Sequence, residues 1–224
     1  MFKDTYKSDE RKKRAQKIVA YLKKTYPNPK TELSYTTDFQ FVASVILSAQ
    51  CTDKKVNAVT DKLWQKYKTL DDFIRADLTV FTRELSSITY YRNKASFIVK
   101  SARIVKEQFG GKVPNTEREL TMLPGVAYKT AHVVLNELFD IAEGIPTDTH
   151  VRRFAIRFDL TDHKELSKIS KDLEELIPKK DWKYVNNGLV LYGRYVCPAL
   201  PHDCKEHPLT KIWGEANVRW PKAK

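Results

Sequence analysis

Apolar residues recur at the spacing of an α-helix along most of the chain. Between residues 39 and 46 they share one face of a helix that Asp38 can cap, and a second stripe follows Thr52-Asp53. A third segment starts after Tyr91 and stops at Gly110-Gly111, a typical C-cap. The same spacing predicts helices over residues 116–122, 128–139, 149–158, 166–177 and 181–195. Because no stretch alternates with period two, the pattern predicts an all-α fold.

Short proline-containing linkers divide the helices into groups. Tyr26-Pro27-Asn28-Pro29 follows the first helix, and Gly144-Ile145-Pro146 precedes the C-terminal helices. A chain of 224 residues has room for one large or two small domains. We expect a central helical domain over residues 31–142 and a second, discontinuous one built from residues 1–30 and 143–224.

The charge balance favours a polyanionic partner. Lys and Arg number 40 against 28 Asp and Glu, a net charge of +12, which suggests nucleic acid first and an anionic membrane second. No apolar run reaches the roughly 20 residues of a membrane span, and the polar N-terminus lacks a secretory signal. We therefore expect an intracellular protein, in the cytoplasm or nucleoid if bacterial, without membrane association and monomeric by default. The seven glycines form no dinucleotide-binding or Walker A motif.

The most informative stretch is Leu123-Pro124-Gly125-Val126-Ala127-Tyr128-Lys129-Thr130-Ala131. A short helix precedes it and a longer one follows, joined by a tight glycine-containing loop. Such a loop exposes backbone N–H groups at the positive end of a helix, where a phosphate binds independently of sequence. The alternative is an ordinary connection between two helices.

This stretch, followed by Pro146-Thr147-Asp148-Thr149-His150, resembles the helix–hairpin–helix and aspartate motif of the endonuclease III family. The resemblance spans roughly residues 10 to 200. Further matching segments cover residues 27–33, 45–53, 91–95, 111–114 and 193–197. It implies a DNA glycosylase with AP lyase activity, with duplex DNA bound in a cleft between the two domains.

Two positions depart from the family pattern. The hairpin usually reads Gly-x-Gly, but Ala127 stands at the second glycine, and Thr89 stands where relatives usually carry glycine. If position 127 needs a positive φ, alanine costs roughly 1 kcal/mol. If the glycine serves only close approach of a phosphate, a methyl group fits.

The resemblance implies that Lys129 is the nucleophile and Asp148 its carboxylate partner. A neutral lysine amine can attack C1′ of the damaged nucleoside, expel the base and form a Schiff base that permits β-elimination. Its pKa must fall for this, and we expect burial and the first turn of the helix to lower it. Asp148 can stabilise positive charge on the sugar, and it can equally cap the helix that begins at Thr149.

The resemblance also implies how a flipped base is replaced. Gln50 would insert opposite the orphan base, and Tyr90 would wedge into the stack, where an aromatic ring is worth roughly 1–3 kcal/mol. Alternatively, Gln50 is a polar helix end and Tyr90-Tyr91 is a half-buried core pair. The implied DNA-binding residues are Gln50, Tyr90, Leu123, Gly125, Ala127, Thr130 and His150.

The family's C-terminal cysteine set is incomplete here. Relatives carry C-x6-C-x2-C-x5-C around a [4Fe–4S] cluster, but only Cys197 and Cys204 match, with His207 and Trp213 at the other two positions. Two thiolates cannot hold such a cluster, so we expect no metal and no cofactor, with the loop held by packing. The alternative is a zinc site that also uses His202, although these spacings are not those of common zinc modules.

We therefore expect a base-excision enzyme that removes oxidised pyrimidines from duplex DNA and cuts the strand. One alternative is a monofunctional glycosylase acting on mismatches or purines, which Lys129 argues against. The other is a helix–hairpin–helix protein that binds DNA without chemistry, which leaves the joint presence of Lys129, Asp148 and Gln50 unexplained.

Overall fold

The computed structural model describes residues 2–221, with side chains from Lys7 onward. Within that range the chain is helical and has no strand, which confirms the all-α prediction. It forms two compact units, one over Thr31–Ile141 and one that joins the residues up to Lys30 to those from Ala142. Every helix in the described range is too short or too polar to cross a lipid bilayer.

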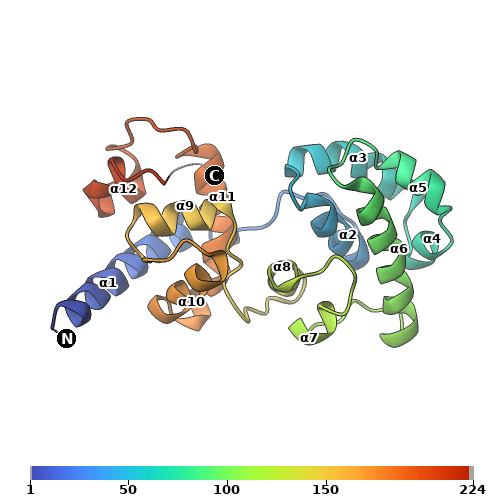
Figure 1. Ribbon diagram of the computed structural model, residues 1–224, viewed down its shortest axis with the longest axis horizontal. Helices are drawn as coiled ribbons and strands as arrows, with labels where there is room; N and C mark the ends of the chain where they lie inside the picture. Colours follow the sequence, from blue (N-terminus) through green and yellow to red (C-terminus); the bar gives the residue numbers. More distant parts are fainter. Residues whose placement is uncertain (1, 222–224) are drawn as a thin grey trace. The chain divides into compact units, whose positions relative to one another are not determined.

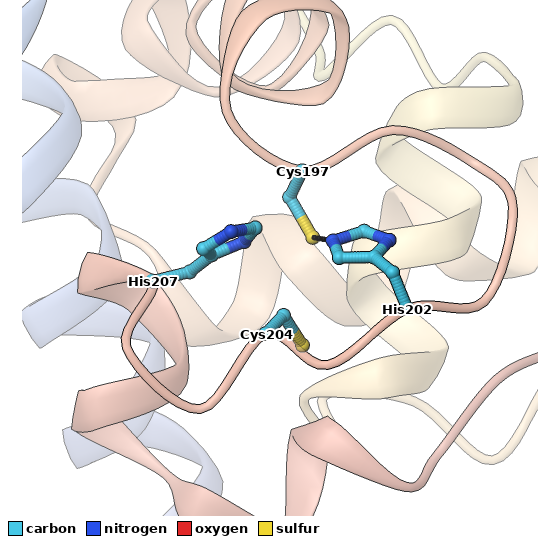
Figure 2. A group of neighbouring side chains, drawn as sticks. All are labelled: Cys197, His202, Cys204 and His207. Carbon is cyan, nitrogen blue, oxygen red and sulfur yellow. Dashed lines mark hydrogen bonds between the residues drawn. The ribbon is translucent and has the colours of Figure 1, made fainter.

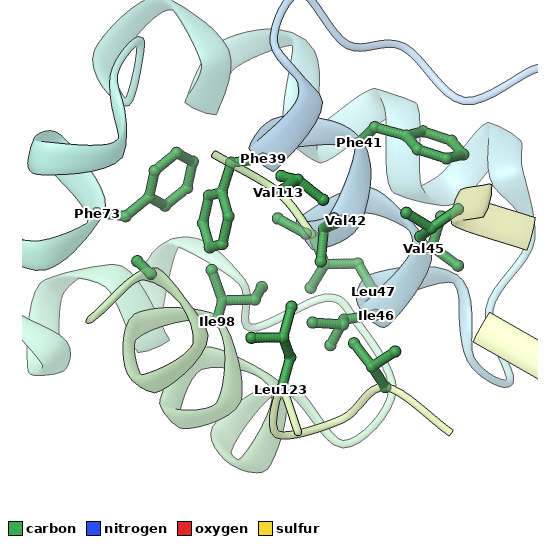
Figure 3. Packing of buried hydrophobic residues seen from close by; sticks show 14 of the residues in the cluster. Phe39, Phe41, Val42, Val45, Ile46, Leu47, Phe73, Ile98, Val113 and Leu123 are labelled. Atoms are coloured by element: carbon green, nitrogen blue, oxygen red, sulfur yellow. The ribbon is translucent and has the colours of Figure 1, made fainter. Parts of the chain in front are cut away.

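The unit over residues 31–141 is built around α2, whose residues from Phe39 to Leu47 are all buried. Helices α3, α6 and α8 pack against it, and Figure 3 shows its side chains meeting Phe73, Ile98 and Leu123 in the core. In chain order, the helices of this unit are α2 (Asp38–Ser48), α3 (Asp53–Lys66), α4 (Leu70–Ile74), α5 (Leu78–Glu84), α6 (Tyr91–Gln108), α7 (Glu117–Leu120) and α8 (Tyr128–Phe139) (Figure 1).

The start of α2 differs from the sequence expectation. Thr37, not Asp38, is the N-cap, because its side chain accepts a hydrogen bond from the backbone N–H of Gln40. The Gln40 side chain accepts in return from the backbone N–H of Thr37, at 3.2 Å, which completes a capping box. The predicted cap at Thr52 is confirmed for α3.

The other unit brings the first helix against the last ones (Figure 1). Ala15, Ile18, Val19 and Leu22 of α1 are buried in a core shared with α10, α11 and α12. The elements of this unit are α1 (Phe2–Thr25), α9 (Thr149–Arg157), α10 (Leu166–Leu176), the 3-10 helix η1 (Lys179–Tyr184), α11 (Val185–Tyr195), α12 (Pro208–Ile212) and the 3-10 helix η2 (Gly214–Asn217).

The single helix predicted over residues 181–195 is wrong in its first four residues. Residues 179–184 form the tighter helix η1, and the α-helix starts only at Val185. Pro178 supplies the carbonyl for the first turn, which accepts from Asp181 N–H at 2.8 Å. The Trp182 ring N–H donates to Ile177 O at 2.8 Å, so the side chain holds the turn against the end of α10.

Gly193 allows α11 to lie close to α9. A Cβ at this position would clash with the His150 ring and lie 2.7 Å from Nη2 of Arg153, both on α9. We expect Gly193→Ala to destabilise the protein by about 1–3 kcal/mol, because the His150 ring and the buried Arg153 guanidinium, which donates to Cys197 O, must both move. Gly214→Ala is the matched control, since a Cβ there meets nothing within 4 Å. Urea unfolding measures both, and an equal, small effect of the two changes would show that the α9–α11 contact yields without cost.

Candidate functional site

The predicted hairpin is present between α7 and α8. Gly125 adopts φ of +84°, the left-handed region, and a Cβ there would lie 3.0 Å from the Phe97 ring and 3.2 Å from Ile46. The Ser101 hydroxyl of α6 donates to Pro124 O at 3.1 Å and so fixes the loop. No side chain caps α8 at Ala127. The first-turn N–H groups of this helix are therefore available to an anion, which is the arrangement expected of a phosphate-binding hairpin.

Ala127 fits the hairpin without backbone strain. Its φ is −92° and its ψ is 172°, an extended conformation that alanine adopts freely. Thr89 is likewise absent from the positive-φ residues, which include its neighbour Tyr90. Of the two explanations for the family's second glycine, backbone strain therefore does not apply to this chain.

Single substitutions at Gly125 and Ala127 separate the effect of backbone conformation from the effect of contact with DNA. We expect Gly125→Ala to cost about 1–3 kcal/mol of stability through left-handed strain and the clash with Phe97, and to weaken binding to duplex DNA. Ala127→Gly, at an extended position, should change stability by only a few tenths of a kcal/mol. Thermal unfolding and fluorescence anisotropy on intact duplex measure the pair. A Gly125→Ala protein with unchanged affinity would mean that this loop does not contact the backbone of DNA.

Lys129 is the second residue of α8 and its side chain is exposed, as are Ala127 and Tyr128 beside it. The expectation that the protein buries this amine is therefore wrong for the protein alone, because the hairpin projects the first turn away from the core. The position in the first turn of a helix without a side-chain cap is as expected. Thr130, the next residue, is half-buried.

Asp148 is the N-cap of α9. Its Oδ1 accepts from the backbone N–H of His150 at 2.8 Å and of Val151 at 2.9 Å. Both hydrogen bonds use the same oxygen, so Oδ2 takes part in neither of them. Asp148 and His150 are half-buried. The capping role weighed from the sequence is thus present, and it fixes the carboxylate at the end of a helix.

Gln50 and Tyr90 share an unusual backbone conformation. Gln50 follows the end of α2 with φ of 55°, and Tyr90 precedes α6 with φ of 58°, both in the left-handed region that large side chains seldom adopt. Both side chains are exposed, Tyr90 by 63%. The alternative of a half-buried Tyr90-Tyr91 core pair is therefore wrong for Tyr90, although Tyr91 is half-buried. Strain of this kind concentrates at functional sites.

Lys94 connects the segment that carries Gln50 to the helix that follows Tyr90. The sequence alone does not single this residue out. It is only 5% exposed, and its ammonium donates to Leu47 O at 2.9 Å and Ala49 O at 2.6 Å. A residue of the first turn of α6 thus holds the end of α2, directly before Gln50. Burial lowers the pKa of Lys94. The signal in the sequence was a lysine on the apolar face of α6, beside Ala95 and Ile98.

Leu123 belongs to the core and not to the exposed part of the hairpin. Its side chain is 1% exposed and packs beneath the loop (Figure 3), and its carbonyl accepts from Val126 N–H at 3.0 Å. The expectation that Leu123 forms part of the DNA-binding surface is therefore wrong for its side chain, which is buried. Leu123 supports the loop through its packing in the core and its backbone hydrogen bond to Val126.

A group of four metal-ligating side chains lies in the loop between α11 and α12. Figure 2 shows Cys197, His202, Cys204 and His207 converging, and their ligand atoms all lie within 4.8 Å of one another. Both cysteines are buried and both histidines are half-buried. The expectation that the chain uses no metal is therefore not supported, because these residues could hold an ion.

The four residues do not fit a [4Fe–4S] cluster. Such a cluster takes four thiolates, one on each iron, whereas here two thiols and two imidazoles point at one place. Trp213, at the fourth cysteine position, instead packs with its ring 4.1 Å from the guanidinium of Arg14 on α1. Trp213 and Trp220 pack against the core of this unit, so packing does contribute to holding the loop.

Arg157 contacts both cysteines of this group, and the sequence alone does not single it out. It is fully buried, and it donates to Cys197 Sγ at 3.0 Å, to Cys204 Sγ at 2.9 Å and to Ala216 O at 2.8 Å. Its guanidinium lies 3.7 Å from the Trp220 ring. The signal in the sequence was a pair of arginines, Arg153 and Arg157, one turn apart on the buried face of α9.

Comparison with known proteins agrees with the hairpin and the helical architecture. Residues 43–179 match the family model described as HhH-GPD superfamily base excision DNA repair protein. Endonuclease III of Synechocystis sp. is 40% identical over 95% of this chain and 97% of its own length, and that of Bacillus subtilis is 39% identical over 87% and 89%. A solved structure of a trapped endonuclease III–DNA covalent intermediate superposes with a TM-score of 0.83 at 35% identity, covering 93% of this chain and 98% of that one. The chain therefore belongs to the endonuclease III family of the HhH-GPD superfamily and is a base-excision DNA-repair glycosylase.

Proposed function

We propose that this glycosylase also cleaves the DNA strand, with Lys129 as the nucleophile and Asp148 as the second catalytic group. The observation that carries the proposal is the placement of Lys129, an exposed amine in the first turn of a helix with no side-chain cap, directly after the Gly125 loop. The uncapped turn offers N–H donors to a phosphate, so the amine is held beside a bound backbone. One of the solved structures similar to this chain is that of a trapped covalent intermediate between endonuclease III and DNA.

In this mechanism the Lys129 amine attacks C1′ of the damaged nucleoside and the bond to the base breaks. At a damaged nucleoside the departing base takes the bonding electron pair and a proton, whereas at an abasic site the C1′ oxygen leaves as water. The amine and sugar then form a Schiff base with ring opening, and abstraction of a C2′ proton expels the 3′ phosphate. Because the protein leaves Lys129 exposed, bound DNA must supply the desolvation that favours the neutral amine.

Asp148 acts on the charge that develops on the sugar. Its Oδ1 is held by two backbone N–H groups at 2.8 and 2.9 Å, which keeps the carboxylate in one orientation. A preoriented carboxylate stabilises a cationic sugar without reorganising during the reaction. It can also relay the proton from the attacking amine.

The substrate class that we propose is an oxidised or ring-saturated pyrimidine in duplex DNA, with an abasic site as the minimal substrate. Removing a base from the stack leaves a gap, and Gln50 and Tyr90 are the side chains we assign to it. Both are exposed at helix ends, and Lys94 holds the segment that carries Gln50. Gly125, Ala127 and Thr130 would contact the DNA backbone, with His150 beside Asp148.

Borohydride trapping on a duplex with one abasic site tests the lyase step. We expect the wild-type protein to form a covalent adduct, which borohydride reduces to a stable amine. Absence of an adduct, together with release of the base from a second duplex that carries one oxidised pyrimidine, would establish a monofunctional glycosylase. Absence of both would leave a DNA-binding protein without chemistry.

A further inference from the structure

We propose that Cys197, His202, Cys204 and His207 bind a single Zn²⁺ ion, in the place where the family carries an iron–sulfur cluster. Their ligand atoms lie within 4.8 Å of one another, and Cys197 Sγ is 3.8 Å from His202 Nε2 (Figure 2). Tetrahedral zinc, with Zn–S of about 2.3 Å and Zn–N of about 2.0 Å, separates its ligand atoms by about 3.3–3.8 Å. A contraction of at most about 1.5 Å closes the group around one ion.

The imidazole of His202 is already oriented for a metal. Its Nδ1 lies 2.8 Å from Leu200 O and can only donate to that carbonyl. The proton is therefore on Nδ1, and Nε2 carries the lone pair that faces Cys197. A ring N–H held by a backbone carbonyl is the usual support of a metal-bound histidine.

The imidazole of His207 contains a buried nitrogen without a partner. Among the described residues, Nδ1 of His207 is shielded from solvent and makes no hydrogen bond. Leaving such an atom unsatisfied is costly, and native proteins seldom do so without a metal or a water. The backbone N–H of His207 donates to Cys204 O at 3.0 Å. This hydrogen bond closes a turn that brings the two ligands close together.

Both sulfurs are surrounded by hydrogen-bond donors. Arg157 donates to each of them, and the Thr210 hydroxyl lies 3.6 Å from Cys204 Sγ. A metal ion holds cysteines as thiolates, which are far better acceptors for a guanidinium than thiols. The fully buried Arg157 then has two anionic neighbours, as a buried charge requires.

The donor set selects the metal. Two thiolates and two imidazoles form the Cys₂His₂ set of structural zinc sites. The same set can divide over the two irons of a Rieske cluster, but that arrangement separates the cysteine pair from the histidine pair. Here a cysteine sulfur and a histidine nitrogen are 3.8 Å apart, which indicates a mononuclear site. Its role would be to hold the loop between α11 and α12.

The test is the metal content of the full chain, purified without a histidine tag and under reducing conditions. We expect about one zinc per chain by mass spectrometry and no sulfur-to-iron absorption. If the protein is isolated without metal, Co²⁺ should give the visible bands of a tetrahedral sulfur–nitrogen site, which Zn²⁺ then removes. Iron in cluster amounts would overturn the proposal. So would failure to bind either Zn²⁺ or Co²⁺, which would show that Arg157 alone pairs with the sulfurs.

Variants assign the ligands. We expect Cys204→Ser and His207→Ala to lose most of the bound zinc, whereas Cys51→Ser, a cysteine of the other unit, should retain it. Because loss of a ligand can also unfold the loop, the Co²⁺ spectrum of the His202→Cys variant is a second measurement. A folded His202→Cys protein should bind Co²⁺ with stronger sulfur-to-metal absorption than the wild type. An unchanged spectrum would exclude His202 as a ligand and overturn the four-residue site.

Discussion

Lys129→Gln is expected to abolish the borohydride-trapped adduct and to lower the rate of strand cleavage at an abasic site by about 10³-fold or more. Glutamine keeps a polar side chain of similar length on the exposed first turn of α8 but has no amine to form a Schiff base. Stability should be almost unchanged, because the Lys129 side chain is exposed. Single-turnover cleavage, trapping and thermal unfolding measure the three effects.

Lys62→Gln provides the charge control for this experiment. Lys62 is an exposed lysine on α3, so its loss removes the same charge from the same unit without touching the hairpin. Persistent trapping by the Lys129 variant would mean that another amine forms the Schiff base. Lys94 is a poor candidate for that amine, because it is buried and its donors already meet two backbone carbonyls. Full activity of the variant would remove Lys129 from the mechanism.

Two substitutions at Asp148 should separate catalysis from helix capping. Asp148→Asn is expected to reduce strand cleavage by about 10²–10⁴-fold, because the neutral amide neither stabilises a cationic sugar nor accepts a proton. Asparagine caps helices as well as aspartate, so the stability of α9 should be retained. Asp148→Ala should lose the same activity and, in addition, about 1 kcal/mol of stability, since His150 and Val151 then lack their acceptor.

The comparison of the two Asp148 variants is informative because this residue caps α9 and is also the second catalytic group that we propose. Rates are compared at saturating abasic DNA, and stabilities by urea unfolding. If Asp148→Asn cleaves DNA like the wild type, the carboxylate is only a cap and the catalytic assignment fails. If Asn and Ala lower activity in proportion to their loss of stability, the effect belongs to α9 and not to the chemistry.

Much of the fold follows from local patterns along the chain. The predicted helix over residues 128–139 matches α8, and the stop at Gly110-Gly111 follows α6, because apolar spacing and glycine conformation are properties of neighbouring residues. The cap of α2 was misplaced by one residue because both Thr37 and Asp38 are good caps, and only the extended backbone of Thr37 decides between them. The 3-10 geometry of residues 179–184 depends on the Trp182 contact to Ile177, which spacing does not reveal.

The candidate site also contains some features that local sequence predicts and others that depend on tertiary packing. The hairpin and its lysine are a contiguous motif, so the sequence locates them. The exposure of Lys129, the buried position of Leu123 and the left-handed backbone of Tyr90 arise from packing across distant segments. The spacing of Cys197, His202, Cys204 and His207 matches no common zinc module, so the spacing alone does not predict that they converge. Its convergence depends on Arg157 of α9 and on a turn from Cys204 to His207, neither of which is visible in the spacing of the ligands.

The discontinuous unit has a consequence for how the chain folds as it leaves the ribosome. Helix α1 is synthesised before α10, α11 and α12, which cover Ala15, Ile18 and Leu22 and emerge only after residue 165. The unit over residues 31–141 contains all its own partners and can bury its core in the meantime. The apolar residues of α1 therefore stay uncovered until these later helices have been made, which leaves apolar surface exposed on the nascent chain for most of its synthesis.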